Sequence, residues 1–90
     1  MSKICQKAWV RGTVQGVFYR ASTKHKAMQL NITGYAKNLA DGSVEVLMCG
    51  EAHAVKALLL WLPQGSPQSK VESVSTESVD LVPPSEFEVL

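Results

Sequence analysis

The sequence predicts an α+β sandwich, in which a four-stranded antiparallel sheet carries two helices on one face and a short C-terminal strand at its edge. Three observations predict it. Two segments have the residue pattern of helices, other segments have the apolar pattern of strands, and a tight-turn signal lies between the two helical segments. The order strand, helix, strand, strand, helix, strand describes a ferredoxin-like arrangement. Ninety residues suffice for one such core, so we expect residues 1–90 to form a single domain.

The N-terminal third of the chain predicts a strand followed by a helix. Apolar and polar residues alternate from residue 4 to residue 11, as they do in a strand with one covered face. Residues 20–30 are rich in helix formers, and Asn31 suits the left-handed backbone that often ends a helix. The side chains expected to face inward from these two elements are those of Ile4, Ala8, Val10, Ala27, Met28 and Leu30.

A hairpin and a second helix are expected next. Residues 32–39 and 43–49 predict two strands, because an Asp-Gly pair within residues 40–42 tolerates the positive φ of a tight turn. Residues 51–62 predict an amphipathic helix. Its inward side chains, which recur at helical spacing, are those of Val55, Leu58, Leu59 and Leu62.

The C-terminal part predicts the last strands of the sheet. Residues 71–82 carry valines among serine, threonine and glutamate, and Pro83 and Pro84 end that strand. Residues 87–90 then form a short closing strand at the edge of the sheet.

Basic and acidic residues are distributed unevenly along the chain. The first of the eight acidic residues is Asp41, whereas seven of the nine basic residues precede it. An anion-binding site is therefore expected before Asp41, with long-range pairing between the two halves as the alternative explanation. The net charge of only +1 argues against nucleic acid or a membrane as a partner. The seven basic residues are Lys3, Lys7, Arg11, Arg20, Lys24, Lys26 and Lys37.

No segment suggests insertion into a membrane or export. The apolar runs fall short of the roughly 18 residues that span a bilayer. The N-terminal segment MSKICQKAW has no long apolar stretch before a small-residue cleavage site. We therefore expect a cytoplasmic protein without a membrane partner.

The segment between the first strand and the first helix, residues 12–20, predicts a phosphate site. N–H groups at the start of a helix lack partners within the helix, and those of a glycine-containing loop can converge on one anion. Arg20 opposes the helix dipole unless an anion lies beside it, although a solvated surface arginine is the alternative. The expected phosphate-binding residues are Thr13, Val14, Gln15, Gly16, Val17, Phe18, Tyr19 and Arg20, with Gly12 in support.

Asn38 lies near the end of the second predicted strand, just before the turn. A neutral amide can accept a hydrogen bond from water and donate one to a developing charge, so it can orient a nucleophile without repelling an anion. From the residues alone, an asparagine that only shapes the turn is the simpler interpretation.

Together the two segments resemble the signatures of the acylphosphatase family, V-x-G-x-V-Q-G-V-x-F-R and G-W-V-x-N-x-x-D-G-x-V-E. Residues 10–20 match the first, with Tyr19 where phenylalanine is usual. Residues 34–45 match the second, with Tyr35 and Ala36 as conservative departures. The resemblance implies an enzyme that hydrolyses the carboxyl-phosphate bond of acyl phosphates to a carboxylate and inorganic phosphate, with water as the nucleophile.

The resemblance also implies roles for single residues. Arg20 and the loop amides would bind the substrate phosphate, and Asn38 would position the attacking water. Thr23 would support Arg20 from one helical turn further on. Leu39 departs from members that have a hydroxyl residue after the asparagine, so any help from that position is absent here.

The residues offer no sign of a metal site or another cofactor. His25 and His53 stand alone, without the spacing of metal ligands, and are expected on helix surfaces. A phosphate oxygen of the substrate could itself take the proton of the water, so no general base is required. We expect a monomer without metal or cofactor, whose partners are an acyl phosphate and inorganic phosphate.

The two cysteines lie in the first and third predicted strands, which are antiparallel neighbours in the ferredoxin-like order. If Cys5 faces Cys49 across these strands, the pair is close enough for a disulfide on the face without helices. Two free thiols are the alternative, because disulfides are rare in the cytosol. The same register pairs Lys7 with Leu47 and Trp9 with Glu45.

Two other functions are compatible with the same predicted fold. A nucleic-acid-binding module is suggested by the basic N-terminal part, but Trp9 alone on the open face makes a poor stacking platform. A phosphate-sensing module would keep the phosphate site without turnover, which the presence of Asn38 does not favour.

Overall fold

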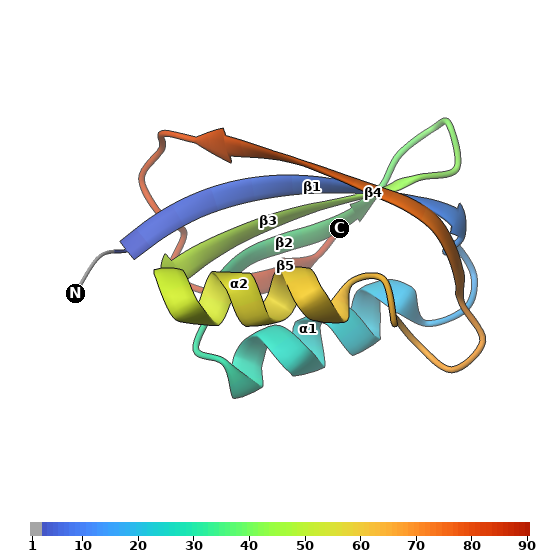
Figure 1. Cartoon of the computed structure of the whole chain (residues 1–90), viewed down its shortest axis with the longest axis horizontal. Helices are drawn as coiled ribbons and strands as arrows, with labels where there is room; N and C mark the ends of the chain where they lie inside the picture. The colour runs from blue at the N-terminus through green and yellow to red at the C-terminus, as the bar shows by residue number, and fades with distance from the viewer. Residues whose placement is uncertain (1–2) are drawn as a thin grey trace.

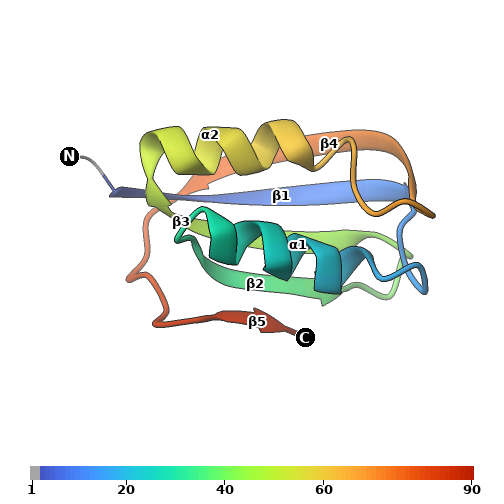
Figure 2. The ribbon, with the colours of Figure 1, turned by 90° about the horizontal axis from the view of Figure 1, so that it is seen from below.

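The computed structural model describes residues 3–90 as one sheet covered on a single face by two helices (Figures 1 and 2). Residues 1 and 2, which begin the N-terminal segment considered above, lie outside the described residues. Among residues 3–90, no helix combines the length and the apolar character that a membrane span requires. The elements are β1 (Lys3–Thr13), α1 (Tyr19–Gln29), β2 (Thr33–Asn38), β3 (Val44–Glu51), α2 (Ala52–Trp61), β4 (Lys70–Val79) and β5 (Phe87–Val89).

The sheet has five strands in the order β4-β1-β3-β2-β5. The first four are antiparallel neighbours, as predicted. The closing strand makes the sheet mixed, because β5 runs parallel to β2. The cause lies in the connection at residues 80–86: β4 ends at the end of the sheet where β2 begins, so β5 starts beside β2 and runs in the same direction (Figure 2).

The ends of the elements differ by a few residues from the predicted ones. β4 ends at Val79 rather than at residue 82, before the prolines are reached. Glu51 is the last residue of β3 and precedes α2, which begins at Ala52. Asn31 has the predicted left-handed backbone after α1, with φ 57.

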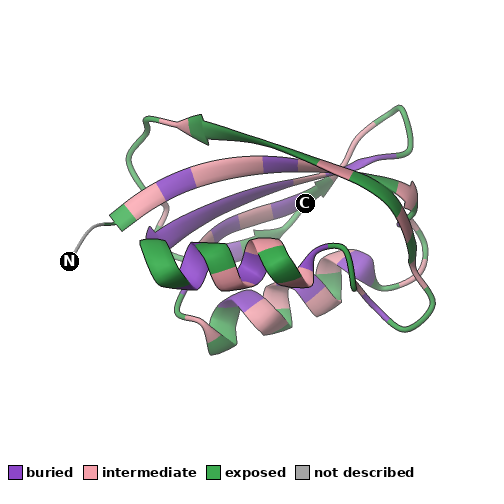
Figure 3. Ribbon diagram, viewed as in Figure 1, coloured by how far each residue is buried: buried purple, intermediate pink, exposed green. Residues whose placement is uncertain are grey.

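The main core lies between the sheet and the helices (Figure 3). Ala8 and Val10 of β1 are fully buried there, as are Leu58 and Leu62. Burial of a leucine side chain contributes about 1.5 to 3 kcal/mol to the free energy of unfolding. The inward face predicted for residues 51–62 is therefore confirmed.

One predicted core residue in α1 is wrong. Met28 is 61% exposed, whereas Ala27 beside it is fully buried. The buried residues of α1 are Tyr19, Thr23 and Ala27, which are four positions apart. This spacing defines the face that meets the sheet, and Met28 lies about 100° further round the helix than Ala27.

Three connections meet at one end of the sheet, as both views show (Figures 1 and 2). They are the loop from β1 to α1, the hairpin turn from β2 to β3, and the connection from α2 to β4. Both motif segments contribute to this end of the molecule.

Candidate active site

The segment from the end of β1 to the start of α1 contains three residues with positive φ: Gly12 (133°), which still belongs to β1, Gly16 (77°) and Phe18 (60°). At Gly12 a glycine is required, because a Cβ atom there would overlap the carbonyl group of Lys70 in β4. Phe18 immediately precedes α1, and its side chain provides no cap for the helix. We call residues 12–20 the cradle.

The cradle is held in place mainly through its side chains. Val14 and Tyr19 are both buried, with 1% of each residue exposed. The hydroxyl of Tyr19 donates a hydrogen bond of 2.7 Å to the carbonyl oxygen of Leu62 at the end of α2. From the α2–β4 connection, Ser66 Oγ donates to the carbonyl oxygen of Val17 at 2.7 Å. These contacts fix the loop without using its N–H groups.

The backbone donors in the middle of the cradle are free within the described part of the chain. The N–H groups of residues 15–18 donate to no backbone acceptor there. The first turn of α1 adds N–H groups at the positive end of the helix dipole and contains no acidic side chain. A fixed loop with free N–H groups beside a helix N-terminus is an arrangement that binds phosphate oxygens in proteins.

Arg20 is half-buried in the first turn of α1, and its Nη1 donates a hydrogen bond of 2.7 Å to the main-chain oxygen of Leu90. A guanidinium has five N–H donors, so most of them are available to another acceptor. The one ion pair between side chains in residues 3–90 joins Lys7 and Glu45. Arg20 therefore has no carboxylate side chain as a partner there.

Asn38 is the last residue of β2 and lies opposite Val44 in β3. Its Oδ1 atom is buried and accepts no hydrogen bond from any described residue. Such an atom costs roughly 1 to 3 kcal/mol of stability, so its presence calls for an explanation. The N–H group of Asn38 donates, at 3.4 Å, to the same main-chain oxygen of Leu90 that Arg20 contacts. The structure thus brings the two predicted catalytic residues together around Leu90.

The side chain of Gln15 connects the cradle to the β2–β3 hairpin. Its Nε2 donates hydrogen bonds to the carbonyl oxygens of Leu39, at 2.8 Å, and of Ser43, at 2.9 Å. The sequence predicts only a contribution from the loop at this position. The reach of the side chain across to the hairpin is an additional finding.

Two predicted residues lie apart from the free N–H groups. Thr13 is the exposed last residue of β1 and pairs with Lys70 of β4. Thr23 is fully buried, and its Oγ1 donates a hydrogen bond of 2.8 Å to the carbonyl oxygen of Tyr19. Thr23 therefore supports the first turn of α1 from within the helix, by a bond to its own backbone.

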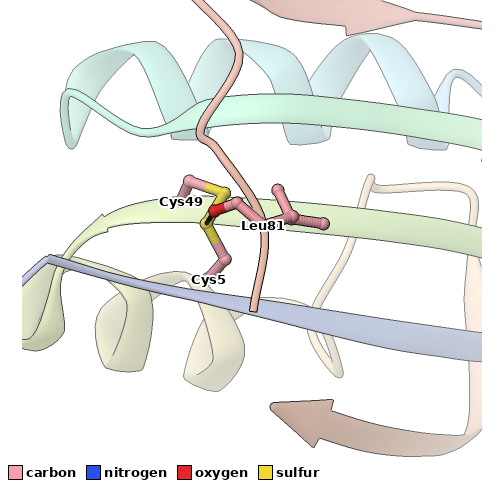
Figure 4. The surroundings of a disulfide bond; sticks show 3 residues. All are labelled: Cys5, Cys49 and Leu81. Atoms are coloured by element: carbon pink, nitrogen blue, oxygen red, sulfur yellow. Dashed lines mark hydrogen bonds between the residues drawn. A yellow bond between two sulfur atoms is a disulfide. The ribbon is translucent and has the colours of Figure 1, made fainter. Parts of the chain in front are cut away.

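Cys5 and Cys49 form a disulfide on the face of the sheet that the helices leave open (Figure 4). β1 and β3 pair in the predicted register, which places the two Cα atoms 4.1 Å apart. Leu81, from the β4–β5 connection, passes over the bond, with its carbonyl oxygen 3.9 Å from Cys5 Sγ. Because Cys5 is near the start of β1 and the cradle follows its end, the disulfide is remote from the cradle.

Glu45 organises the polar part of the open face. Its two carboxylate oxygens accept hydrogen bonds from Trp9 Nε1, at 2.9 Å, and from the hydroxyl of Tyr35, and Lys7 Nζ lies 3.9 Å away. Partial burial and the bond to Glu45 raise the pKa of Tyr35 to about 12. Burial favours a higher pKa for Glu45, but the bonds from Tyr35 and Trp9, together with the charges of Lys7 and Lys37, outweigh it and lower that pKa. Trp9 is therefore accompanied on this face by a second aromatic residue, contrary to the prediction.

Neither histidine is part of a ligand cluster in the described chain. His25 and His53 are exposed on α1 and α2, and the ring of His25 is 3.3 Å from the side-chain amide of Gln29. Within residues 3–90, no three His, Cys, Asp or Glu side chains are grouped closely enough to hold a metal ion. Independence from metal stays a prediction for the enzyme assay.

A model of the acylphosphatase family matches residues 6–89, which include the cradle and the hairpin with Asn38. The chain belongs to the acylphosphatase family. The resemblance of the two motifs is thereby confirmed over nearly the whole sequence, and with it the expected class of enzyme, a hydrolase of the acylphosphatase type.

Individual acylphosphatases are similar to this chain in sequence and in structure. A curated acylphosphatase of Chromohalobacter salexigens is 52% identical over 85 residues, which are 94% of either chain. A solved acylphosphatase from Coxiella burnetii is 41% identical, with a TM-score of 0.93 over 98% of this chain and 93% of that one. The acylphosphatase from Bacillus subtilis is 31% identical, with a TM-score of 0.93 over 97% and 98% of the two chains.

Two contacts of this candidate site have no signal in the motifs. The main-chain oxygen of Leu90 contacts both Arg20 and Asn38, yet the C-terminal residues predict only an edge strand. Ser66 fixes the cradle from a polar loop that shows no pattern of its own. In both cases the acceptor is a backbone group, which residue types do not reveal.

Proposed function

We propose that the chain hydrolyses acyl phosphates at the cradle, where Arg20 and the free N–H groups bind the phosphate and Asn38 orients the attacking water. The observation that carries this proposal is the meeting of Arg20 and Asn38 at the main-chain oxygen of Leu90. Membership of the acylphosphatase family supports the substrate class.

The phosphate end of the substrate is bound by groups that exist before it arrives. The N–H groups of residues 15–18 surround the phosphate oxygens, and the guanidinium of Arg20 adds a fork of charged donors. Charge that develops on the phosphoryl oxygens during reaction is stabilised by donors that need no rearrangement. Most of the rate enhancement then comes from positioning and electrostatic stabilisation.

Asn38 acts on the water. Its buried Oδ1 accepts a hydrogen bond from the water and directs the lone pair of the water oxygen at phosphorus. The new bond joins the water oxygen to phosphorus, and the electron pair of the broken bond leaves with the carboxylate. A phosphate oxygen takes the proton released by the water. Because the carboxylate is a good leaving group, the step needs no general acid.

An assay of the purified chain tests this function directly. Acetyl phosphate and benzoyl phosphate are supplied with a metal chelator, and the released inorganic phosphate is measured. We expect steady turnover, with kcat of about 1 to 1,000 per second and no effect of the chelator. Phosphate binding without turnover would instead indicate a sensing module, and turnover abolished by the chelator would contradict metal independence.

The proposal includes a setting for the enzyme: residues 1–90 as a single-domain monomer in the cytoplasm, with small acyl phosphates and inorganic phosphate as its partners and without nucleic acid. The single domain is supported by the curated relative, which the chain covers over 94% of its length. Light scattering tests the monomer, cell fractionation the location, and a mobility-shift assay nucleic-acid binding. Location also affects the disulfide, because the cytosol keeps most thiols reduced.

A further inference from the structure

We propose that Gln15 is a positioning residue for the reaction: its side-chain amide holds the hairpin that carries Asn38 in a fixed place relative to the cradle. The inference rests on the proposed function and adds to it. It assigns the direct side-chain link between the phosphate site and the water site to one residue.

The two acceptors of Gln15 flank Asn38 in space. Leu39 follows Asn38 in the chain, and its carbonyl oxygen is 2.8 Å from Gln15 Nε2. Ser43, whose carbonyl oxygen is 2.9 Å from the same nitrogen, precedes Val44. Val44 is the residue opposite Asn38 in the pairing of β2 with β3. One amide group therefore holds both strands of the hairpin next to the proposed water site.

The hairpin does not need Gln15 in order to close. The Leu39 carbonyl oxygen already accepts from the N–H group of Gly42 at 3.2 Å, and the Ser43 carbonyl oxygen accepts from the N–H group of Leu39 at 2.9 Å. The turn is stabilised further by Asp41, whose Oδ1 accepts from the N–H group of Ser43 at 2.9 Å. The hydroxyl of Ser43 donates to the same Oδ1, and this bond, together with the one from the Ser43 N–H group, lowers the pKa of the Asp41 carboxyl group. Each of these two carbonyl oxygens thus accepts one hydrogen bond within the hairpin and a second one from Gln15.

The other end of the Gln15 side chain is anchored in the cradle. Val14, the preceding residue, is buried in the core, and Gly16 turns the loop with φ 77. Within residues 3–90, no other side-chain hydrogen bond joins the cradle to residues 39–43. Gln15 is consequently the direct polar link between the element that binds phosphate and the element that carries Asn38.

The chemistry explains why such a link matters. The phosphate position is set by the cradle, whereas the water position is set by Asn38 at the end of β2. An attack in line requires reacting atoms about 3 to 3.5 Å apart, and a displacement of about 1 Å can cost 100-fold in rate. Without Gln15 both elements keep their own bonds, but the separation of phosphorus and water is less well defined. Loss of the amide should therefore lower kcat while phosphate binding persists.

The test compares Gln15→Met, which keeps the volume of the side chain but removes both hydrogen bonds, with Gln68→Met in the exposed α2–β4 connection. For each folded variant, kcat with acetyl phosphate and the inhibition constant of inorganic phosphate are measured well below the unfolding temperature. We expect kcat of Gln15→Met to fall about 10- to 100-fold. Its inhibition constant should change less than about 3-fold, and Gln68→Met should match the wild type in both.

A double-mutant cycle shows whether Gln15 acts through Asn38. In the Asn38→Ala background, Gln15→Met should have little further effect on kcat, because the water is no longer held. Independent, multiplying losses would overturn the inference. So would an unchanged kcat, or a loss of phosphate affinity in proportion to kcat, which would make Gln15 a part of phosphate binding.

Two outcomes concern folding and basal activity. If Gln15→Met does not fold, Gln15→Ala provides the same comparison. Failure of both to fold would contradict the positioning role, since the amide would then be a requirement of the fold. A wild-type chain that binds phosphate but hydrolyses no acyl phosphate would reject the proposed function itself, before any variant is compared.

Discussion

The cradle and the open face of the sheet both carry polar groups beside the core, but they differ in whether these groups have hydrogen-bond partners. On the open face, Glu45 accepts hydrogen bonds from Trp9 and Tyr35, and the two cysteines are bonded to each other. In the cradle, the N–H groups of residues 15–18 have no backbone acceptor within the described chain, and Oδ1 of nearby Asn38 is buried without a partner.

Under the proposed function, this difference separates the groups that maintain the fold from those that bind a ligand. Polar groups that bond to one another contribute to the free energy of unfolding. Unpaired groups reduce stability, and proteins retain such groups where function requires them. Substitutions on the open face should therefore lower stability and spare activity, whereas substitutions at the cradle should do the opposite.

The largest effect is expected from Arg20→Ala. Removal of the charged donor should lower kcat/KM about 1,000-fold, because charge on the phosphoryl group loses its strongest partner. The fold should persist, since the side chain makes one described hydrogen bond, to Leu90. Steady-state hydrolysis of benzoyl phosphate measures the loss, and Lys24→Ala, in the same helix, is the matched control. Near-normal hydrolysis by folded Arg20→Ala protein would refute the role.

The open face should show the reverse behaviour when the disulfide is removed. Replacement of Cys5 and Cys49 by serine should lower the free energy of unfolding by about 3 kcal/mol, because the bond closes a loop between residues 44 positions apart. The kcat of the folded variant should match the wild type, since the disulfide and the cradle are at opposite ends of β1. Urea unfolding with and without reductant provides the measurement. A reductant effect on the serine variant, or a loss of kcat while folded, would contradict the separation.

Local patterns predicted much of the fold. In an antiparallel pair of strands, one residue pair determines all the others. The assumed pair of Cys5 with Cys49 was therefore enough to give the observed register of β1 and β3. The prediction that Met28 points inward was wrong because the buried face of α1 includes Thr23. The Thr23 hydroxyl bonds within the helix, so this polar residue gives no apolar signal in the sequence. The parallel direction of β5 depends on the path of residues 80–86, which no periodicity encodes.

The candidate site could be predicted only at positions where the residue type carries the proposed chemistry. Arg20 and Asn38 belong to motifs whose side chains are chemically distinctive. What brings them together is a backbone oxygen of Leu90, 70 residues from Arg20 in the chain. The reach of Gln15 to the Leu39 carbonyl likewise spans 24 residues. Every residue has a carbonyl group, so neither contact leaves a trace in the sequence.

Asn38→Ala sharpens the comparison at the cradle, with a smaller expected loss than Arg20→Ala. We expect kcat to fall about 100-fold, as for the loss of one oriented polar group, with the inhibition constant of phosphate unchanged. Stability should not decrease, because the change removes a buried acceptor without a described partner. Calorimetry and steady-state kinetics measure the two quantities. Weaker phosphate binding with kcat preserved would instead show that Asn38 binds the phosphate.

The smallest effect concerns the pH dependence of stability on the open face. The pKa of Glu45 is lowered from 4.5 in the folded protein, so the unfolded chain binds more protons and stability falls as the pH drops below about 4.5. The pKa of Tyr35 is raised from 10 to about 12, so stability also falls as the pH rises through that range. Urea midpoints across both ranges measure these slopes.

Glu45→Gln tests how far that carboxylate contributes to both slopes, since burial also raises the pKa of Tyr35. The substitution should cost about 1 kcal/mol at neutral pH, reduce the loss of stability in acid and weaken the alkaline loss, because Tyr35 no longer donates to a charge. Glu88→Gln, an exposed carboxylate on β5, is the control. If Glu45→Gln retained the full acid slope, Glu45 would not be its cause. If the substitution lowered kcat at neutral pH, the open face would contribute to activity as well as to stability. An unchanged kcat with a weaker pH dependence of stability would show that the polar groups of the open face stabilise the fold without taking part in the reaction.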